Sequence, residues 1–247
     1  MSRKVMTTTG YKNVIDRKVS NGDGTYRNVA RRILWSNDGN HQTLWERSPP
    51  AVAYGLVFTG TQRINTGITG SSNLRVVVDV IQSPVPQNPV STDTPLFGSR
   101  VGMNDRTWCY WQQVNEQVRT DYGNTSYLLD RSHAPFNQRL IIDKNKNVTK
   151  VNGTIIHTVS YPISFTNTID LYLGNVGIAA QHANNFNGTM YSCQIYDNDV
   201  LVRDFVPVPQ GDTTYSTTPA PSNCMWDKVS QAYFQNNGTG SFGIVGT

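Results

Sequence analysis

The feature that most constrains the fold is a long series of short strand-favouring runs separated by turn residues. From residue 51 onward, runs rich in Val, Ile, Thr and Tyr alternate with clusters of Gly, Asn, Asp and Pro. Asn-Gly pairs at 152–153, 187–188 and 237–238 predict tight turns, because both residue types tolerate a positive φ. Many short strands with no convincing helix are typical of a β-sandwich or jelly roll. The expected strands cover residues 53–58, 63–65, 74–82, 96–100, 108–114, 117–121, 139–144, 146–151, 154–159, 169–175, 188–197, 200–206, 232–236 and 241–245.

The composition excludes a helical bundle. The chain holds two glutamates beside fifteen aspartates, and only 15% of its residues are charged, where about 25% is usual. Its 37% hydrophobic content is enough for a core and argues against global disorder. No apolar run is long enough to span a membrane, and the N-terminal residues lack the apolar segment of a secretion signal. We therefore expect a globular all-β protein without membrane insertion.

The basic charge is concentrated in residues 1–50, which hold nine Lys and Arg against four acids, whereas the rest holds twelve against thirteen. Turn signals at 21–24 and 37–40 separate strand-like pieces at 12–19, 28–35 and 43–46, and Ser48-Pro49-Pro50 follows as a stiff linker. This predicts a β-rich N-terminal arm over 1–50 and a second domain over 51–247. The arm lacks a recognition helix or a stacking platform, so docking to protein is favoured over nucleic acid. The residues expected to make that attachment are Arg17, Lys18, Arg31, Arg32, Trp35 and Trp45.

Alternation within the strands predicts which side chains face the core. In residues 74–81 the even positions up to 80 are apolar, so Arg75 and Asp79 are expected on the opposite face. The segments 83–95 and 209–223 are rich in Pro, Thr and Ser and are expected to be long loops. The three cysteines show no metal-site spacing, so we expect free thiols in a protein made in a reducing cytoplasm.

Two blocks near the C-terminus carry a family resemblance. Residues 186–207 read FNGTMYSCQIYDNDVLVRDFVP, and residues 224–242 read CMWDKVSQAYFQNNGTGSF. Shorter pieces precede them as LFGSR at 96–100, LIID at 140–143, VNG at 151–153 and LYLG at 171–174. In this order they resemble phage and prophage virion proteins with a concanavalin A-like (laminin-G-like) jelly-roll domain. ILW at 33–35 and LWE at 44–46 also resemble the leader that precedes such domains in tail proteins.

The resemblance covers residues 51–247 and implies a concanavalin A-like jelly-roll sandwich in a component of the virion. The segment 209–223 is longer than the usual connection, and CMW at 224–226 stands where the family has Gly-Leu-Tyr. The blocks also fit structural roles, with Asn198-Asp199 as a turn and Asp227 as a turn cap. Core positions are expected at Tyr191, Ile195, Leu201 and Phe205.

Enzyme chemistry is disfavoured. Glycoside hydrolases need two carboxylates that face each other across the sugar, and Glu46 and Glu116 are far apart in the sequence. The four histidines are isolated, and no nucleophile elbow is present. A bacterial glycoside hydrolase of the same fold remains the less favoured alternative.

Two kinds of ligand are considered. Calcium could use loop oxygens, and the candidate carboxylates are Asp93, Asp105, Asp121, Asp197 and Asp199, although their spacing selects none of them. Carbohydrate binding needs aromatic rings with nearby amides, and the candidates are Trp108, Tyr110, Asn104, Asn184 and Asn185. On a strand, Trp108 and Tyr110 face one way and Trp111 the other, so core packing competes with this assignment.

The sequence therefore predicts a non-enzymatic virion protein, made in the host bacterium, that contacts other virion proteins and forms a homo-oligomer. Two roles stay open. One is adhesion to host surface glycans from a tail fibre, baseplate or head fibre, and the other is a purely architectural role as a decoration or collar protein. No cofactor is expected apart from the calcium considered above.

Overall fold

A computed structural model describes residues 11–20, 26–35, 41–46, 54–84, 93–101, 107–113, 117–160, 162–177 and 186–246. The chain divides into two compact units, Met1–Val52 and Ala53–Thr247. The described residues hold nineteen strands and one short 3₁₀-helix, Arg131–His133. The predicted all-β class is thereby confirmed. Within the described residues, no helix has the length and apolar character of a membrane span.

The first unit is a three-stranded antiparallel sheet in the order β1-β2-β3. Its strands are β1 (Tyr11–Ser20), β2 (Tyr26–Trp35) and β3 (His41–Glu46). β2 and β3 pair antiparallel, from Arg31 beside Glu46 to Trp35 beside His41. A register shift between Val14 and Arg17 marks a bulge in β1.

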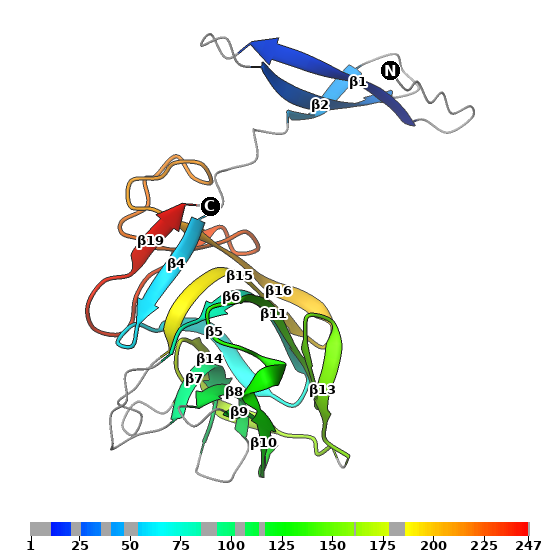
Figure 1. Cartoon of the computed structure of the whole chain (residues 1–247). Helices are drawn as coiled ribbons and strands as arrows, with labels where there is room; N and C mark the ends of the chain where they lie inside the picture. Colours follow the sequence, from blue (N-terminus) through cyan, green and yellow to red (C-terminus); the bar gives the residue numbers. More distant parts are fainter. Residues whose placement is uncertain are drawn as a thin grey trace. The chain divides into compact units, whose positions relative to one another are not determined.

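The second unit is a sandwich of two antiparallel sheets (Figure 1). The smaller sheet has the order β10-β9-β8-β7-β14-β5, and the larger has the order β13-β12-β11-β6-β15-β16-β17-β18, with β4 beside β15 and β19 beside β4. Such paired sheets are consistent with the predicted jelly roll. The strands are β4 (Tyr54–Thr59), β5 (Ile64–Ser71), β6 (Leu74–Gln82), β7 (Asp93–Ser99), β8 (Thr107–Gln113), β9 (Gln117–Gly123), β10 (Thr125–Asp130), β11 (Arg139–Asn145), β12 (Val148–Val151), β13 (Thr154–Thr158), β14 (Thr166–Leu173), β15 (Asn187–Asp197), β16 (Val200–Val208), β17 (Cys224–Asp227), β18 (Ala232–Phe234) and β19 (Gly243–Gly246).

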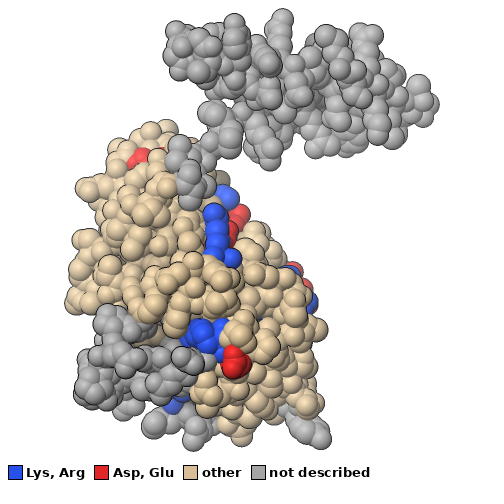
Figure 2. Space-filling model, viewed as in Figure 1, with Lys and Arg blue, Asp and Glu red and all other residues tan. Residues whose placement is uncertain are grey.

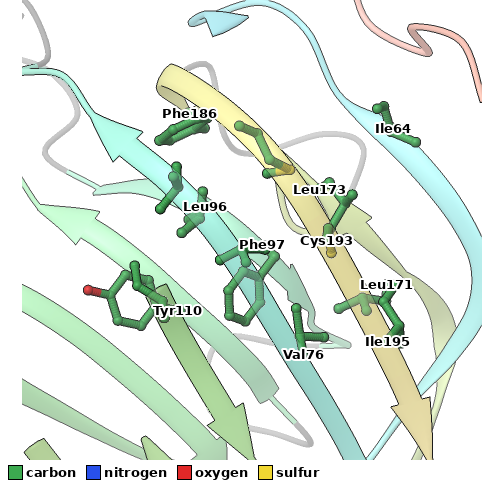
Figure 3. Close-up of a cluster of buried hydrophobic side chains, with 14 of the residues drawn as sticks. Ile64, Val76, Leu96, Phe97, Tyr110, Leu171, Leu173, Phe186, Cys193 and Ile195 are labelled. Carbon is green, nitrogen blue, oxygen red and sulfur yellow. The ribbon is translucent and has the colours of Figure 1, made fainter. Parts of the chain in front are cut away.

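The core lies between the two sheets. β6 alternates strictly between buried and half-buried residues, and its even positions up to 80 face inward as predicted. These side chains share one core cluster with residues of the opposite sheet, and Figure 3 shows Val76 of β6 in it together with Phe97, Leu171 and Leu173. Full burial of such a side chain stabilises the fold by about 1.5–3 kcal/mol, so this layer fixes how the two sheets pack. The face in Figure 2 carries few charged side chains, in keeping with the low charged fraction of the chain.

Lys144 is an unusual member of this interior. Only 1% of the residue is exposed, and its Nζ donates to Thr120 Oγ1 at 2.9 Å. Thr120 Oγ1 in turn lies 2.9 Å from Thr149 Oγ1, on β12 of the opposite sheet. The Lys144 ammonium also lies 5.2 Å from the centre of the Trp108 ring. Burial lowers the pKa of Lys144 from 10.5 to about 8.

The two C-terminal blocks meet at Asp227, which is fully buried. Its carboxylate accepts hydrogen bonds from the backbone N–H groups of Asp204, Val229 and Ser230, and from the Ser230 hydroxyl. Arg203 lies 3.6 Å away. Burial opposes ionisation, but these hydrogen bonds outweigh it and lower the pKa of Asp227. The prediction that Asp227 caps a turn is confirmed.

Several other sequence predictions can be checked here. Asn198 and Asp199 both have positive φ and join β15 to β16, as expected of a tight turn. Ile195 and Phe205 are buried, but Tyr191 is half-buried and Leu201 is exposed, so these two core assignments are wrong. Two bulges explain both. Tyr191 is the extra residue of a bulge in β15, and Val202 is the extra residue of a bulge in β16, which turns Leu201 to the outer face with its partner Tyr196.

A further error concerns the pair at 187–188, which lies inside β15 rather than in a turn. Gly188 has a φ of +151°. A Cβ there would approach the Ile81 backbone oxygen to 2.2 Å, so glycine is required by close strand packing instead. Segment 209–223 contains no strand, and the three cysteines are free and buried, as predicted. Residues 85–92 of the other expected loop lie outside the described residues, whereas 93–95 belong to β7.

Candidate functional site

The two aromatic residues first proposed for carbohydrate binding lie inside the sandwich. Trp108 and Tyr110 are both fully buried, and their rings pack against Phe97 at centroid distances of 5.7 and 5.9 Å. Neither ring offers a face to a sugar, so these two assignments are corrected to core positions. The physical reason is strand alternation, which directs 108 and 110 inward and Cys109 and Trp111 to the other face. Asn104, Asn184 and Asn185 lie outside the described residues.

The predicted attachment residues all lie on the three-stranded sheet of the first unit. Arg17 and Lys18 are on β1, Arg31, Arg32 and Trp35 on β2, and Trp45 on β3. In the register, Arg31 lies beside Glu46, Arg32 beside Trp45, and Trp35 beside His41. Attachment through these residues remains a prediction.

The candidate calcium carboxylates are spread over separate elements. Asp93 is the first residue of β7 and Asp197 the last of β15, Asp199 pairs with Lys146 at 2.9 Å, and Asp105 is not among the described residues. Within the described part of the chain, no three His, Cys, Asp or Glu side chains converge as a metal site would require. Calcium binding therefore rests on the sequence prediction alone.

The outer face of the smaller sheet carries the polar and aromatic residues that alternate with the core. Across the strands, the register aligns Ser126 of β10, Asp121 of β9, Cys109 of β8, Gly98 of β7 and Tyr172 of β14. The row ends at Asn65 of β5. Cross-strand neighbours on one face are close enough to interact, so this row defines two side-chain clusters, one at each end.

The first cluster, around Trp111, is buried. The Trp111 indole Nε1 donates to Asp121 Oδ2, and the Arg119 guanidinium stacks on the Trp111 ring at 4.1 Å. Arg119 also pairs with Asp121, with Nε and Oδ1 3.2 Å apart. Burial raises the pKa of Asp121, against the opposing effects of Arg119 and the hydrogen bonds to Ser126 and Trp111. These side chains pack on and pair with one another below the surface, which favours a structural role.

The second cluster, which we call the Tyr172 cluster, consists of Arg63, Asn65, Asp170 and Tyr172, all half-buried. The Asn65 Nδ2 donates to Asp170 Oδ2 at 3.0 Å and to the Tyr172 hydroxyl at 3.2 Å. The Asn65 Oδ1 accepts from the backbone N–H of Gly67 at 2.8 Å. Arg63 lies over the Tyr172 ring, 6.0 Å from its centre. Asn65 thus fixes the positions of the carboxylate and the phenol.

The second C-terminal block lies along the outer edge of β5, the strand that carries Asn65, and along Arg63 just before it. Asn236 Oδ1 accepts from Arg63 N–H at 3.0 Å, and Asn237 Oδ1 accepts from Asn65 N–H at 2.9 Å. Backbone N–H groups of Asn237 and Thr239 donate to the carbonyls of Arg63 and Thr61. An edge strand left open is a site of unwanted pairing. The turn at residues 236–240 (NNGTG) covers this edge of the sheet, and its hydrogen bonds fix the backbone of Arg63 and Asn65 in the Tyr172 cluster.

Sequence reasoning missed the Tyr172 cluster because its members come from segments about a hundred positions apart. Residues 63–65 and 169–175 are both predicted as strands, but no single-sequence pattern indicates that β5 and β14 are neighbours. The only local signal is that Arg63 and Asn65, at odd-numbered positions, are polar, whereas Ile64 between them is apolar and buried.

The Tyr172 cluster offers groups that suit a polyhydroxylated ligand. One face of an aromatic ring lies beside a carboxylate that can accept from a hydroxyl, and the Tyr172 hydroxyl accepts from Asn65 and keeps its own proton to donate. The Arg63 guanidinium adds charged donors. Binding sites for small polar ligands combine apolar surface with a few fixed polar groups in this way.

The described part of the second unit is thus a two-sheet antiparallel β-sandwich with a polar, aromatic outer face. A scan against protein-family models finds no match, and a search of curated proteins finds no relative. Among solved structures, the chain is similar to a putative carbohydrate binding protein from Bacteroides ovatus. The TM-score is 0.55 at 10% sequence identity, over 88% of this chain and 68% of that protein. At this identity the similarity concerns the fold.

Proposed function

We propose that this protein is a non-enzymatic carbohydrate-binding β-sandwich whose sugar site is the Tyr172 cluster. The observation that carries the proposal is a half-buried tyrosine ring flanked by a carboxylate and a guanidinium, with an asparagine that orients the carboxylate and the phenol. The fold shared with a putative carbohydrate binding protein supports the same class of function.

Each member of the cluster has a distinct part in the proposed site. The Tyr172 ring provides an apolar surface for the C–H face of a sugar, and its hydroxyl donates a hydrogen bond. The second carboxylate oxygen of Asp170, Oδ1, accepts from a sugar hydroxyl, and a charged acceptor makes that hydrogen bond stronger than a neutral one would. Asn65 positions both groups and uses its own amide in doing so.

We further propose that the protein is a bacteriophage virion component that displays this domain toward host surface glycans. The support is the resemblance of residues 186–207 and 224–242 to blocks of phage virion proteins, together with the basic first unit. In this proposal the first unit contacts other virion proteins, and a homo-oligomer follows the symmetry of the particle.

Binding is tested on an array of neutral and acidic oligosaccharides with the full chain and its Tyr172→Ala variant. The matched control is Tyr196→Ala, which removes a half-buried tyrosine from the outer face of the larger sheet. We expect Y172A to lose binding and Y196A to keep it. Equal binding by both variants, or no binding by the wild type, contradicts the proposed site.

The location on a particle is tested by immunogold labelling of intact virions with antibody against residues 51–247. Label on the tail tip or on projecting fibres supports adhesion. Uniform label on the head or collar supports the architectural alternative. Particles without label contradict the virion proposal while leaving carbohydrate binding open.

A further inference from the structure

Arginines that stack on aromatic rings recur in the second unit, and most of them have an aspartate partner. Four such arginines pair with a carboxylate within 3.6 Å. In each case the aromatic ring lies under the guanidinium and the carboxylate lies beside it. The four sets are Arg75 with Tyr196 and Asp143, Arg139 with Tyr191 and Asp79, Arg119 with Trp111 and Asp121, and Arg203 with Phe234 and Asp227.

Arg63 on Tyr172 departs from this pattern. Its Nε donates to the Asn237 carbonyl at 3.3 Å, and among the described residues its guanidinium has neither an ion pair nor a second hydrogen bond. The anchored Nε holds the side chain in place, and the terminal amino groups remain to bind a ligand. Arginine presents two parallel N–H groups that match the two oxygens of a carboxylate.

Asp170 stands on the other side of the pair formed by Tyr172 and Asn65. On β14, Asp170 precedes Tyr172 by two positions, and its register partner is Thr69. Arg63 precedes Asn65 by two positions and stands immediately before the start of β5. Because the strands are antiparallel, the charged groups Arg63 and Asp170 lie at opposite ends of the cluster. No ion pair joins them among the described residues. A ligand that spans the Tyr172 ring therefore meets a cation at one end and an anion at the other.

We propose that the Tyr172 cluster selects sugars that carry a carboxylate, of the uronic acid class. This inference rests on the proposed carbohydrate-binding function. The sugar carboxylate pairs with Arg63 and takes the place that an aspartate occupies beside the four stacked arginines named above. A ring hydroxyl donates to Asp170, and the sugar ring covers Tyr172.

The chemistry of the cluster favours an acidic sugar over an acidic peptide. Asp170 repels a second carboxylate, so a run of acidic residues pairs with Arg63 only at the expense of repulsion at the other end. A uronic acid unit has one carboxylate and several hydroxyls, and its hydroxyls satisfy Asp170. The two charges of the cluster thus match the two kinds of group on one sugar unit.

The test compares binding of the full chain to polygalacturonate, to its carboxyl-reduced form and to polyglutamate by calorimetry. The variants are Arg63→Gln and, as a matched control, Arg139→Gln, which removes an arginine that also stacks on a tyrosine but lies on the larger sheet. We expect wild type and R139Q to bind polygalacturonate and to bind the reduced polymer more weakly. R63Q should lose about tenfold or more in affinity for polygalacturonate, as for a charged hydrogen-bonded contact, and should bind the reduced polymer as wild type does.

The outcomes separate this inference from the function on which it rests. Equal affinity of wild type for the two polymers, with binding that Y172A abolishes, overturns the carboxylate preference and keeps the sugar site. An equal loss in R63Q and R139Q indicates general charge attraction and overturns the assignment to Arg63. Preference for polyglutamate points to an acidic peptide and also overturns it. Absence of binding to any glycan on the array contradicts the proposed function itself.

Discussion

Arg75 on β6 and Asp143 on β11 form a two-point ion pair, with Nε–Oδ1 and Nη2–Oδ2 distances of 2.9 Å each. Arg139 and Asp79 form the same arrangement between the same strands, at 2.8 and 2.9 Å. Both strands place Arg and Asp four residues apart, so antiparallel pairing joins each arginine to the aspartate of its neighbour. Both pairs are diagonal in the observed register. A slip of two residues that aligned Asp143 with Asp79 would separate both pairs, whereas the opposite slip would place each arginine directly opposite its aspartate, so the repeat disfavours slippage in one direction only.

A double-mutant cycle with Arg75→Met and Asp143→Asn measures the first pair. We expect a coupling free energy of about 0.5–1 kcal/mol, because the groups are partly exposed but the contact has two points. The control cycle uses Lys146 and Asp199, whose single contact is far more exposed, and its coupling should be close to zero. Urea unfolding provides both values, and equal coupling in the two cycles would be evidence against a special role for the two-point pair.

Gly188 is the glycine whose replacement should be least tolerated. Alanine at 188 would place Cβ 2.2 Å from the Ile81 backbone oxygen at a φ of +151°, in a strand paired on both sides. We expect Gly188→Ala to lower the free energy of unfolding by about 3 kcal/mol or more, since backbone atoms cannot move aside. Gly211→Ala is the control, because Gly211 also has a positive φ but no atom within 4 Å, and it should cost only about 1 kcal/mol. Similar losses in thermal unfolding would contradict the packing argument.

The sequence predicts the fold class well because strand patterns are local. The alternation in β6 identifies the buried face, and the Asn198-Asp199 turn follows from side chains that tolerate positive φ. β10 and β17 are not predicted as strands. β10 is an edge strand in which half-buried and exposed residues alternate, but its sequence, TSYLLD, shows no matching alternation of polar and apolar residues. β17 is short and buried at all four residues, so it has no period of two either.

The candidate site is predicted poorly because it depends on which strands become neighbours. Trp108 and Tyr110 stand out as a dense aromatic cluster, but density in sequence does not distinguish an inner from an outer face. Tyr172 and Asn65 become partners only when β14 pairs with β5. Their roles therefore follow from sheet order, which no pattern in the separate strands encodes.

Asp227 should make stability depend on pH in the acidic range. Its pKa in the folded protein lies below 3.8, the ordinary value, so the unfolded chain binds the proton more tightly. The stabilisation is therefore fully present above that ordinary value and is lost as pH falls through the folded pKa. We expect Asp227→Asn to reduce the free energy of unfolding at pH 7 by about 1–3 kcal/mol, and the difference from wild type should shrink toward pH 2.

Asp199→Asn is the control for Asp227, because Asp199 is exposed in a turn where asparagine is equally suited. Its stability should match that of wild type across the same pH range. Chemical denaturation at several pH values measures both. A loss in D227N that stays constant from pH 7 to pH 2 would show that the carboxylate charge is not the source of the stabilisation.

Lys144 should make stability depend on pH in the same direction as Asp227 does, but in the alkaline range. Its pKa is about 8 in the folded protein against 10.5 ordinarily, so between these values the unfolded chain holds a proton that the folded one has lost. The free energy of unfolding contributed by this group therefore rises as pH increases from 8 to 10.5.

Between pH 8 and 10.5 we expect the free energy of unfolding of wild type to gain on the order of 3 kcal/mol relative to that of Lys144→Met. Tyrosines and cysteines titrate in both proteins and largely cancel in the difference. The control is the same comparison with Lys150→Met, which replaces a lysine at a half-buried position on β12. Parallel stability curves for wild type and K144M would mean that Lys144 keeps an ordinary pKa in the folded protein and that its burial carries no protonation penalty.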